Sequence, residues 1–278
     1  MNLCASHRVE NVISTFFNNC MHNIISSSDV SSADDYHLYE LATTHFIDYA
    51  EKQRLIKLPA GSILTPNGNG LPDFPDETIL VKIFYYFNDK RNLNQGRQLI
   101  ETRLLIKDKL QWSIGTYVWN KEQTEATLQA SGSTRNINWI DDIGKKQVIN
   151  YHIPTHTECT TCHQANLSIL PIGPKLINLS RSVIREGNEI NQLTYFQKII
   201  LLNSLTITVG KLPDWQSIAF SLEERGRAYL DVNCSHCHNS KGYAARTKIF
   251  FDYVVQFDLF YYGVYRYGYI VRILPSES

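Results

Sequence analysis

Two five-residue segments of the form Cys-x-x-Cys-His constrain this chain more than any other feature of its sequence. They are Cys159-Thr160-Thr161-Cys162-His163 and Cys234-Ser235-His236-Cys237-His238. Two thiols with this spacing can each add to one vinyl group of a porphyrin, and the His that follows can bind the iron. The motifs therefore predict two haem c groups, with Cys159, Cys162, Cys234 and Cys237 as covalent attachment sites and His163 and His238 as proximal iron ligands.

The two histidines make the pattern specific. His accounts for 9 of 278 residues, so two Cys-x-x-Cys pairs would both be followed by His roughly once in a thousand cases. A zinc site that uses the four cysteines is one alternative. However, zinc ribbons usually place their pairs about 15–20 residues apart, and here residues 163–233 separate the pairs. A redox dithiol or a pair of disulfides is the other alternative.

Composition limits the remaining classes of protein. A chain of 278 residues is long enough for one large domain or two ordinary ones. Lys+Arg and Asp+Glu both number 27, and no basic patch predicts a nucleic-acid partner. Six cysteines are too few for a disulfide scaffold in a chain of this length. We interpret the two cysteines outside the motifs, Cys4 and Cys20, as free thiols.

The motifs predict a periplasmic protein, because haem c is attached outside the cytoplasm. Residues 1–25 nevertheless contain no apolar segment typical of a signal peptide. We interpret this conflict as a sign that the N-terminus is misassigned, shifted in frame or truncated. Asp258 and Arg266 interrupt the aromatic C-terminal segment, so no transmembrane segment is predicted.

The first half of the chain predicts β-structure after a non-native or disordered segment, 1–33. The spacing of Leu38, Leu41 and Phe46 favours a helix over 34–54, with His45 packed on its apolar face. Residues 34–154 otherwise form a β-rich domain, an antiparallel sandwich or small barrel. Alternating and apolar runs predict its strands at 78–87, 99–106, 112–119, 124–128 and 147–153.

The second half predicts a different architecture. Short helices are expected over 190–202 and 221–230, and Ser221 with Glu224 forms a capping-box pattern at the start of the second. The predicted fold class is therefore α+β, an N-terminal antiparallel β-sandwich-like domain followed by a mainly helical cytochrome c-like haem-binding region over 155–253. Residues 254–278 read as an aberrant or truncated tail, or else as a genuine β-hairpin.

Much of the chain, about residues 39–253, resembles an uncharacterised family of bacterial periplasmic di-haem c-type cytochromes with a β-rich N-terminal region. The segments that carry the resemblance include Tyr39–Thr43, Phe46–Lys52, Leu58–Gly61, Asp73–Pro75, Lys82–Tyr86, Glu101–Leu104, Gly115–Asn120, Glu158–His163, Leu170–Lys175, Leu212–Trp215 and the helix that leads into Cys234. The resemblance implies haem and electron transfer but no substrate. Family members continue with a Met-Pro segment, whereas this chain has only Met1 and Met21.

Several further residues are candidates around the haem groups. His152 and His156 are candidate distal ligands, and His236 is expected to be exposed to solvent. Lys175, Arg181 and Arg185 are candidates to pair with haem propionates. The predicted function is electron transfer with a redox partner protein, as a carrier rather than a catalyst. A peroxidase-like di-haem enzyme or a zinc-binding structural protein is the alternative.

Overall fold

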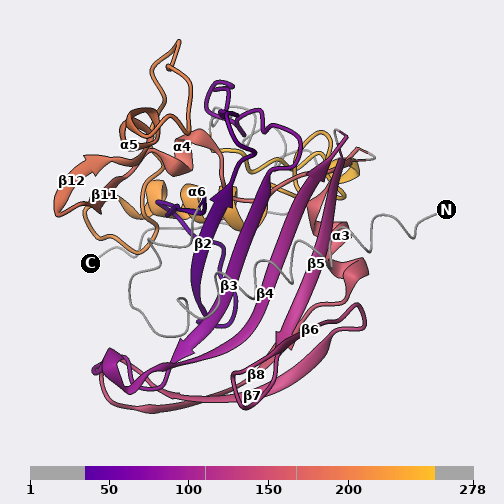
Figure 1. The fold of residues 1–278 in the computed structure, drawn as a ribbon, viewed down its shortest axis with the longest axis vertical. Coiled ribbons are helices and arrows are strands. Elements are labelled where there is room, and N and C mark those ends of the chain that lie inside the picture. The colour runs from indigo at the N-terminus through magenta and orange to yellow at the C-terminus, as the bar shows by residue number, and fades with distance from the viewer. Residues whose placement is uncertain (1–34, 110, 167, 254–278) are drawn as a thin grey trace, which may run out of the picture.

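A single antiparallel sheet of six strands dominates the computed structural model, which describes residues 35–109, 111–166 and 168–253 (Figure 1). The strands follow one another in the order β1-β2-β3-β4-β5-β6. Their bounds are His37–Leu38 (β1), Glu51–Lys57 (β2), Ile79–Phe87 (β3), Arg97–Asp108 (β4), Gln111–Trp119 (β5) and Ala126–Leu128 (β6). This sequential order is expected when consecutive strands are joined by short turns.

Both faces of this sheet are buried. On one face, Leu55, Val81 and Ile83 belong to a cluster with Trp119. On the other, Ile56, Leu80, Leu105 and Trp112 pack against residues of the C-terminal half, Leu176, Leu179, Leu193 and Phe196 among them. Burial on both faces explains why β3 reads as a continuous apolar run rather than as an alternating one.

A separate hairpin crosses the lower end of the sheet in Figure 1. Its strands are β7 (Ser133–Ile140) and β8 (Lys146–Ile153), which pair along their whole length. Trp139, Tyr151 and Ile153 pack from the hairpin against Phe84 and Tyr86 of the large sheet. One face of the large sheet is therefore covered by two parts of the chain. The C-terminal half covers the end near Leu80, and the hairpin covers the end near Phe84 and Tyr86.

Residues 155–253 form short elements of both kinds. The helices are α3 (His156–His163), α4 (Leu176–Leu179), α5 (Gln192–Lys198) and α6 (Leu222–Asn233), and the strands are β9 (Gln164–Ala165), β10 (Ser168–Ile169), β11 (Ser182–Arg185) and β12 (Asn188–Asn191). Two 3-10 turns, η2 (Leu93–Gln95) and η3 (Ala245–Thr247), complete the described elements. In Figure 1, α4, α5, β11 and β12 gather beyond one end of β2 and β3, whereas α3 lies beside β5.

The predicted α+β fold class, with its mainly helical cytochrome c-like region, is therefore wrong. The structure is mostly β-strand, and short strands interrupt the helices throughout 155–253. The chain turns too often for long helices, because Gly173 and Gly187 have positive φ and Ile200, at φ 60°, follows directly after the end of α5. The strands before residue 155 also form one sheet with a packed hairpin, rather than two facing sheets of a sandwich.

The individual elements were predicted with mixed success. Five predicted strands are confirmed as β3, β4, β5, β6 and β8, and two predicted helices as α5 and α6. The helix predicted over 34–54 is wrong, because Asp48 and Tyr49 adopt positive φ and the following residues pair with β3 as strand β2. The predictions for 1–33, for Cys4 and Cys20 and for 254–278 lie outside the described residues.

Among the described residues, none of the helices has the length and apolar character needed to cross a membrane.

Candidate haem and metal site

Helix α3 carries the first motif. Its N-cap Thr155 forms a capping box with Glu158: Thr155 Oγ1 accepts from the Glu158 N–H at 3.2 Å, and Glu158 Oε2 accepts from the Thr155 N–H at 2.8 Å. Such a box satisfies two backbone donors that a helix start otherwise leaves unpaired. The helical repeat then places Cys159, Cys162 and His163 on one face, because residues three and four apart are neighbours on a helix.

The second motif follows helix α6. Ser221 and Glu224 form the predicted capping box at the start of this helix, and Cys234 is its C-cap. The chain then turns back on itself, since the N–H groups of Cys237 and His238 donate to the Cys234 carbonyl at 3.1 and 2.8 Å. The two thiols of the motif therefore lie on one tight turn.

The fold brings the two motifs together. The ligand atoms of Cys162, His236 and Cys237 all lie within 4.8 Å of one another. Ala165 forms an isolated bridge with Gly242, and the Asn166 N–H donates to the Lys241 carbonyl at 2.8 Å. The structure does not place Cys159 or Cys234 in this group, so the four cysteines do not form one common cluster.

Each predicted proximal histidine has one ring nitrogen fixed by the backbone. His163 Nδ1 lies 2.7 Å from the Leu170 carbonyl, and His238 Nδ1 lies 3.2 Å from the Ile249 carbonyl. A carbonyl oxygen only accepts, so Nδ1 carries the proton and donates in both rings. Nε2 is then the unprotonated nitrogen, the tautomer that binds a metal through Nε2. Burial lowers the pKa of His163 to about 4, which keeps its ring neutral at pH 7.

The four motif thiols are protonated at neutral pH. Burial raises the pKa of Cys159, Cys162, Cys234 and Cys237 above the ordinary value for a cysteine. Cys159 is the most buried of them, and its Sγ lies 3.9 Å from Thr116 Oγ1 on β5. These thiols therefore become better nucleophiles or ligands only when a general base takes their protons, or when a bound metal displaces the protons to solvent.

A row of basic side chains crosses the sheet close to the first motif. The register pairs Arg54 with Lys82, Lys82 with Arg103 and Arg103 with Thr116. Arg103 is balanced by Glu101, with Nη2 2.6 Å from Oε1. Arg54 Nη2 is buried without a hydrogen-bond partner in the described structure. Among the residues that the structure describes, Lys82 forms no ion pair, and its Nζ lies 5.0 Å from the centre of the Phe84 ring. Burial and the neighbouring Arg54 and Arg103 lower the pKa of Lys82 well below its ordinary value. An anionic ligand would offset both effects and stabilise the charged form of this side chain.

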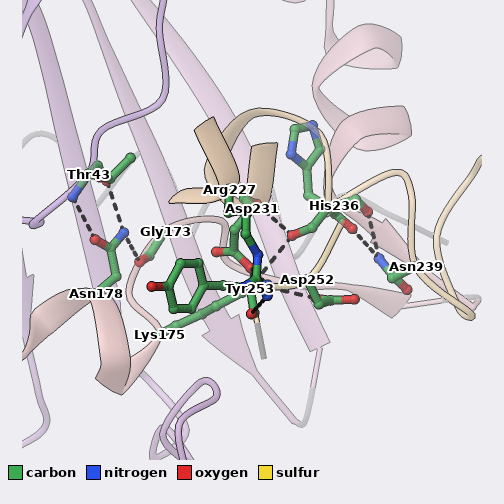
Figure 2. A network of polar contacts seen from close by, with 11 residues as sticks. Thr43, Gly173, Lys175, Asn178, Arg227, Asp231, His236, Asn239, Asp252 and Tyr253 are labelled. Atoms are coloured by element: carbon green, nitrogen blue, oxygen red, sulfur yellow. Dashed lines mark hydrogen bonds and ion pairs between the residues drawn. The ribbon is translucent and has the colours of Figure 1, made fainter. Parts of the chain in front are cut away.

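A hollow next to the motifs, open to solvent, contains about 630 Å³ of empty space, which includes the solvent at its mouth. Cys162, His163 and His236 line it together with Leu170, Lys175 and Asp231. Figure 2 shows the polar network at this wall, where Lys175 reaches Asp231 at 2.8 Å and Asp252 at 3.6 Å. Both motifs therefore contribute to the wall of one hollow.

The three basic residues predicted to meet haem propionates already have partners in this structure. Lys175 pairs with Asp231 and Asp252. Arg181 Nη1 donates to the Leu41 carbonyl at 2.8 Å, and Arg185 Nη2 lies 2.5 Å from Glu40 Oε2. The basic row on β2, β3 and β4, which the sequence did not single out, is the better candidate for an anionic group.

Three of the described histidines outside the motifs, His45, His152 and His156, divide into two groups. The predicted distal ligands are both exposed: His152 lies in β8 and His156 is the first residue of α3. His152 Nε2 lies 3.2 Å from Glu158 Oε1. His45 instead lies inside the site, with its ring centre 5.6 Å from that of His236. Burial, followed by the nearby Lys82, lowers the pKa of His45 to about 2. His45 is thus a neutral nitrogen donor beside the motifs, which sequence analysis had assigned to a packed helix face.

Comparisons with known proteins return no match: no protein-family model, no curated protein and no solved structure is significantly similar to this chain. The family resemblance drawn from its motifs therefore stays a prediction.

Proposed function

We propose that the protein is a c-type cytochrome that carries two covalently attached haem groups and transfers electrons in the periplasm to a redox partner protein. The observation that carries this proposal is the orientation of the two motif histidines. His163 and His238 both donate from Nδ1 to a backbone carbonyl downstream in the chain, which leaves Nε2 for iron. A haem supplies one-electron chemistry when bound, and the chain supplies ligation, orientation and burial.

The residues fit this group in three respects. Cys159 with Cys162, and Cys234 with Cys237, each provide two thiols on one helical turn or tight turn for one porphyrin. The unpartnered Nη2 of Arg54 and the ammonium of Lys82 would meet propionate carboxylates. His45 offers a further neutral nitrogen close to the motifs as a sixth ligand. The chain would thus supply one histidine ligand to each iron and basic side chains to the propionates.

Haem content measured on the full chain tests the proposal. The chain is directed to the periplasm of cells that contain the haem-attachment machinery, and pyridine haemochrome spectra give the number of covalent haems per chain. We expect two for the unchanged chain and one after the double substitution Cys159→Ser and Cys162→Ser. The exchange His163→Ala should alter one haem spectrum and leave the other near normal.

The matched control for His163→Ala is His156→Ala, because His156 lies in the same helix but is exposed. This control should keep both spectra unchanged. Absence of c-type absorbance in the covalently bound fraction would refute the proposal. Equal loss of both haems on removal of one cysteine pair would refute the assignment of each motif to its own haem.

A further inference from the structure

Cys162, His236 and Cys237 form a group that haem attachment does not explain. Their ligand atoms lie within 4.8 Å of one another, although one residue comes from the first motif and two from the second. Attachment of haem uses the thiols of each motif in pairs, and it gives no role to a residue between two thiols. His236 is such a residue, and it lies beside the sulfur of the other motif rather than in solvent.

His236 offers a buried ring nitrogen to a ligand. Its Nδ1 is buried and forms no hydrogen bond in the described structure. Asn239 holds the motif backbone in place, as Figure 2 shows, with Nδ2 donating to the Ser235 carbonyl at 2.7 Å and to the His236 carbonyl at 3.1 Å. A buried nitrogen without a partner is costly unless a ligand occupies it.

The spacing of the three atoms is close to that of a tetrahedral metal site. Zinc binds sulfur at about 2.3 Å and imidazole nitrogen at about 2.0 Å, so tetrahedral angles separate two sulfurs by about 3.8 Å and a sulfur from a nitrogen by about 3.5 Å. Because no two of these atoms are more than 4.8 Å apart, the sulfurs need to approach by at most about 1.0 Å and a sulfur and nitrogen by at most about 1.3 Å. Side-chain rotation of cysteine and histidine can supply a movement of this size.

We infer that the chain without haem binds one thiophilic divalent ion, of which zinc is the type, through Cys162, His236 and Cys237, with water at the fourth position. Two sulfurs and an imidazole select such an ion over magnesium or calcium. Each thiol releases its proton to solvent as its sulfur binds the metal, and no electron is transferred. The ion and the two haems exclude one another, because both need the sulfurs of Cys162 and Cys237.

Cobalt(II) is the probe that tests this site. The full chain is made in cells without the haem-attachment machinery, reduced with a phosphine and titrated with cobalt(II) under anaerobic conditions. We expect one ion per chain, sulfur-to-cobalt charge-transfer absorption, and bands typical of tetrahedral cobalt that disappear when zinc is added. The exchanges His236→Asn and Cys162→Ser should each weaken cobalt binding at least about 100-fold, because loss of a ligand costs more than loss of a residue that supports one.

The remaining cysteines of the motifs provide the matched controls. Cys159→Ser and Cys234→Ser remove one thiol from each motif but no ligand of the site, so both should bind cobalt like the unchanged chain. Equal weakening in Cys159→Ser and Cys162→Ser would overturn the inference in favour of a four-cysteine site. Lack of a charge-transfer band in the unchanged chain, or an unaltered band in His236→Asn, would overturn it outright.

The same variant keeps this inference separate from the proposed function. His236→Asn leaves both Cys-x-x-Cys-His patterns complete, so it should still receive two haems while it loses cobalt. Failure of the unchanged chain to receive haem would contradict the cytochrome proposal without affecting the cobalt titration. Circular dichroism of the His236→Asn chain shows whether lost binding reflects the lost ligand or a lost fold, and a folded chain with lost binding supports the site.

Discussion

Removal of one partner from the ion pair between Glu101 and Arg103 is expected to destabilise the fold strongly. Glu101 is completely buried, and the Arg103 side chain is 15% exposed. Glu101 accepts hydrogen bonds from Arg103 Nε at 2.9 Å, from Arg103 Nη2 at 2.6 Å and from the Tyr151 hydroxyl at 2.5 Å. The substitution Glu101→Gln keeps the size of the side chain but removes its charge and replaces one acceptor with a donor.

The structure sets the expected magnitude. Loss of one partner from a buried ion pair costs about 3–5 kcal/mol, because the other charge stays buried without compensation. Arg103 keeps some contact with solvent and lies 4.5 Å from the centre of the Phe84 ring, so the lower end of that range applies. We expect Glu101→Gln to lower the free energy of unfolding by about 3 kcal/mol. With a slope of about 3 kcal/mol per molar urea, the midpoint should fall by about 1 M.

Urea unfolding followed by tryptophan fluorescence measures this shift. Trp119 and Trp139 are buried in two different apolar clusters, one on each face of the large sheet, so unfolding exposes both side chains to solvent. Glu125→Gln is the control, because Glu125 is exposed and such changes usually stay within about 0.5 kcal/mol. If the Glu101→Gln chain does not fold, Tyr151→Phe provides a milder test, with an expected loss of about 1.5 kcal/mol. A midpoint for Glu101→Gln equal to that of the control would refute the reasoning.

Three further predictions concern separate parts of the molecule. Burial lowers the pKa of Lys52 to about 8 from 10.5. Between these pH values the unfolded chain binds one more proton than the folded chain, so the free energy of unfolding should rise with pH, by about 1–2 kcal/mol after allowance for solvent screening. Urea midpoints measured across this pH window should rise less in Lys52→Met, and equal slopes in the two chains would contradict the prediction. Thr155→Ala removes the N-cap of α3 and should lower stability by about 1 kcal/mol, which calorimetry would register as a fall of about 2–4 °C in Tm; an unchanged Tm would show that the cap is dispensable. Gly242→Ala would place a Cβ 2.3 Å from the Cys237 carbonyl oxygen, whereas Gly226, inside α6, has open space around it. Thermal unfolding should show a loss of about 2 kcal/mol for Gly242→Ala and a gain of up to about 1 kcal/mol for Gly226→Ala, and equal behaviour of the two would contradict this account of the turn.

The strands of the large sheet could be predicted from sequence because their residues are β-branched or aromatic and follow the period of a strand. Strand β7 was missed because Ser131-Gly132-Ser133 reads as a turn and because Asn136 and Asn138 are unusual in strands. Its pairing with β8 satisfies the backbone of these polar residues, and Trp139 supplies the apolar contact. Local composition does not contain that information.

The helix predicted over 34–54 failed for a related reason. Leu38, Leu41 and Phe46 do recur at helical spacing, but they do not form one helix face. Leu38 and Leu41 pack in different apolar clusters, and the Phe46 N–H donates to Asn233. The Ala42 N–H donates to the Asn178 carbonyl, and the Thr43 N–H to the side-chain oxygen of Asn178 at 2.9 Å. Tertiary hydrogen bonds over more than a hundred residues of sequence therefore replaced the local ones that a helix would need.

The motif residues could be named from spacing alone, because the chemistry of attachment is local. The approach of Cys162 to Cys237 could not, because it depends on the path of residues 163–233. The position of His45 beside the motifs could not be predicted from sequence either. Nor could the row of Arg54, Lys82 and Arg103, because the register of strands β2 to β5 aligns these residues and Thr116 side by side. Spacing predicts which residues can bind a group, but only the register of the sheet shows what surrounds that group.

The long hydrogen bonds of the segment after β1 have a consequence for the order in which the chain folds. Gln192 Oε1 accepts from the Glu40 N–H, the Thr43 hydroxyl donates to the Pro213 carbonyl, and Asn233 Oδ1 accepts from the Phe46 N–H, over separations of 152, 170 and 187 residues. During synthesis this segment has to wait until almost all of the described chain has been made. Contacts so distant in sequence close late and slowly. A stalled or shortened chain would therefore leave the segment after β1 without these partners, and its backbone would stay open to proteolysis until the C-terminal half is complete.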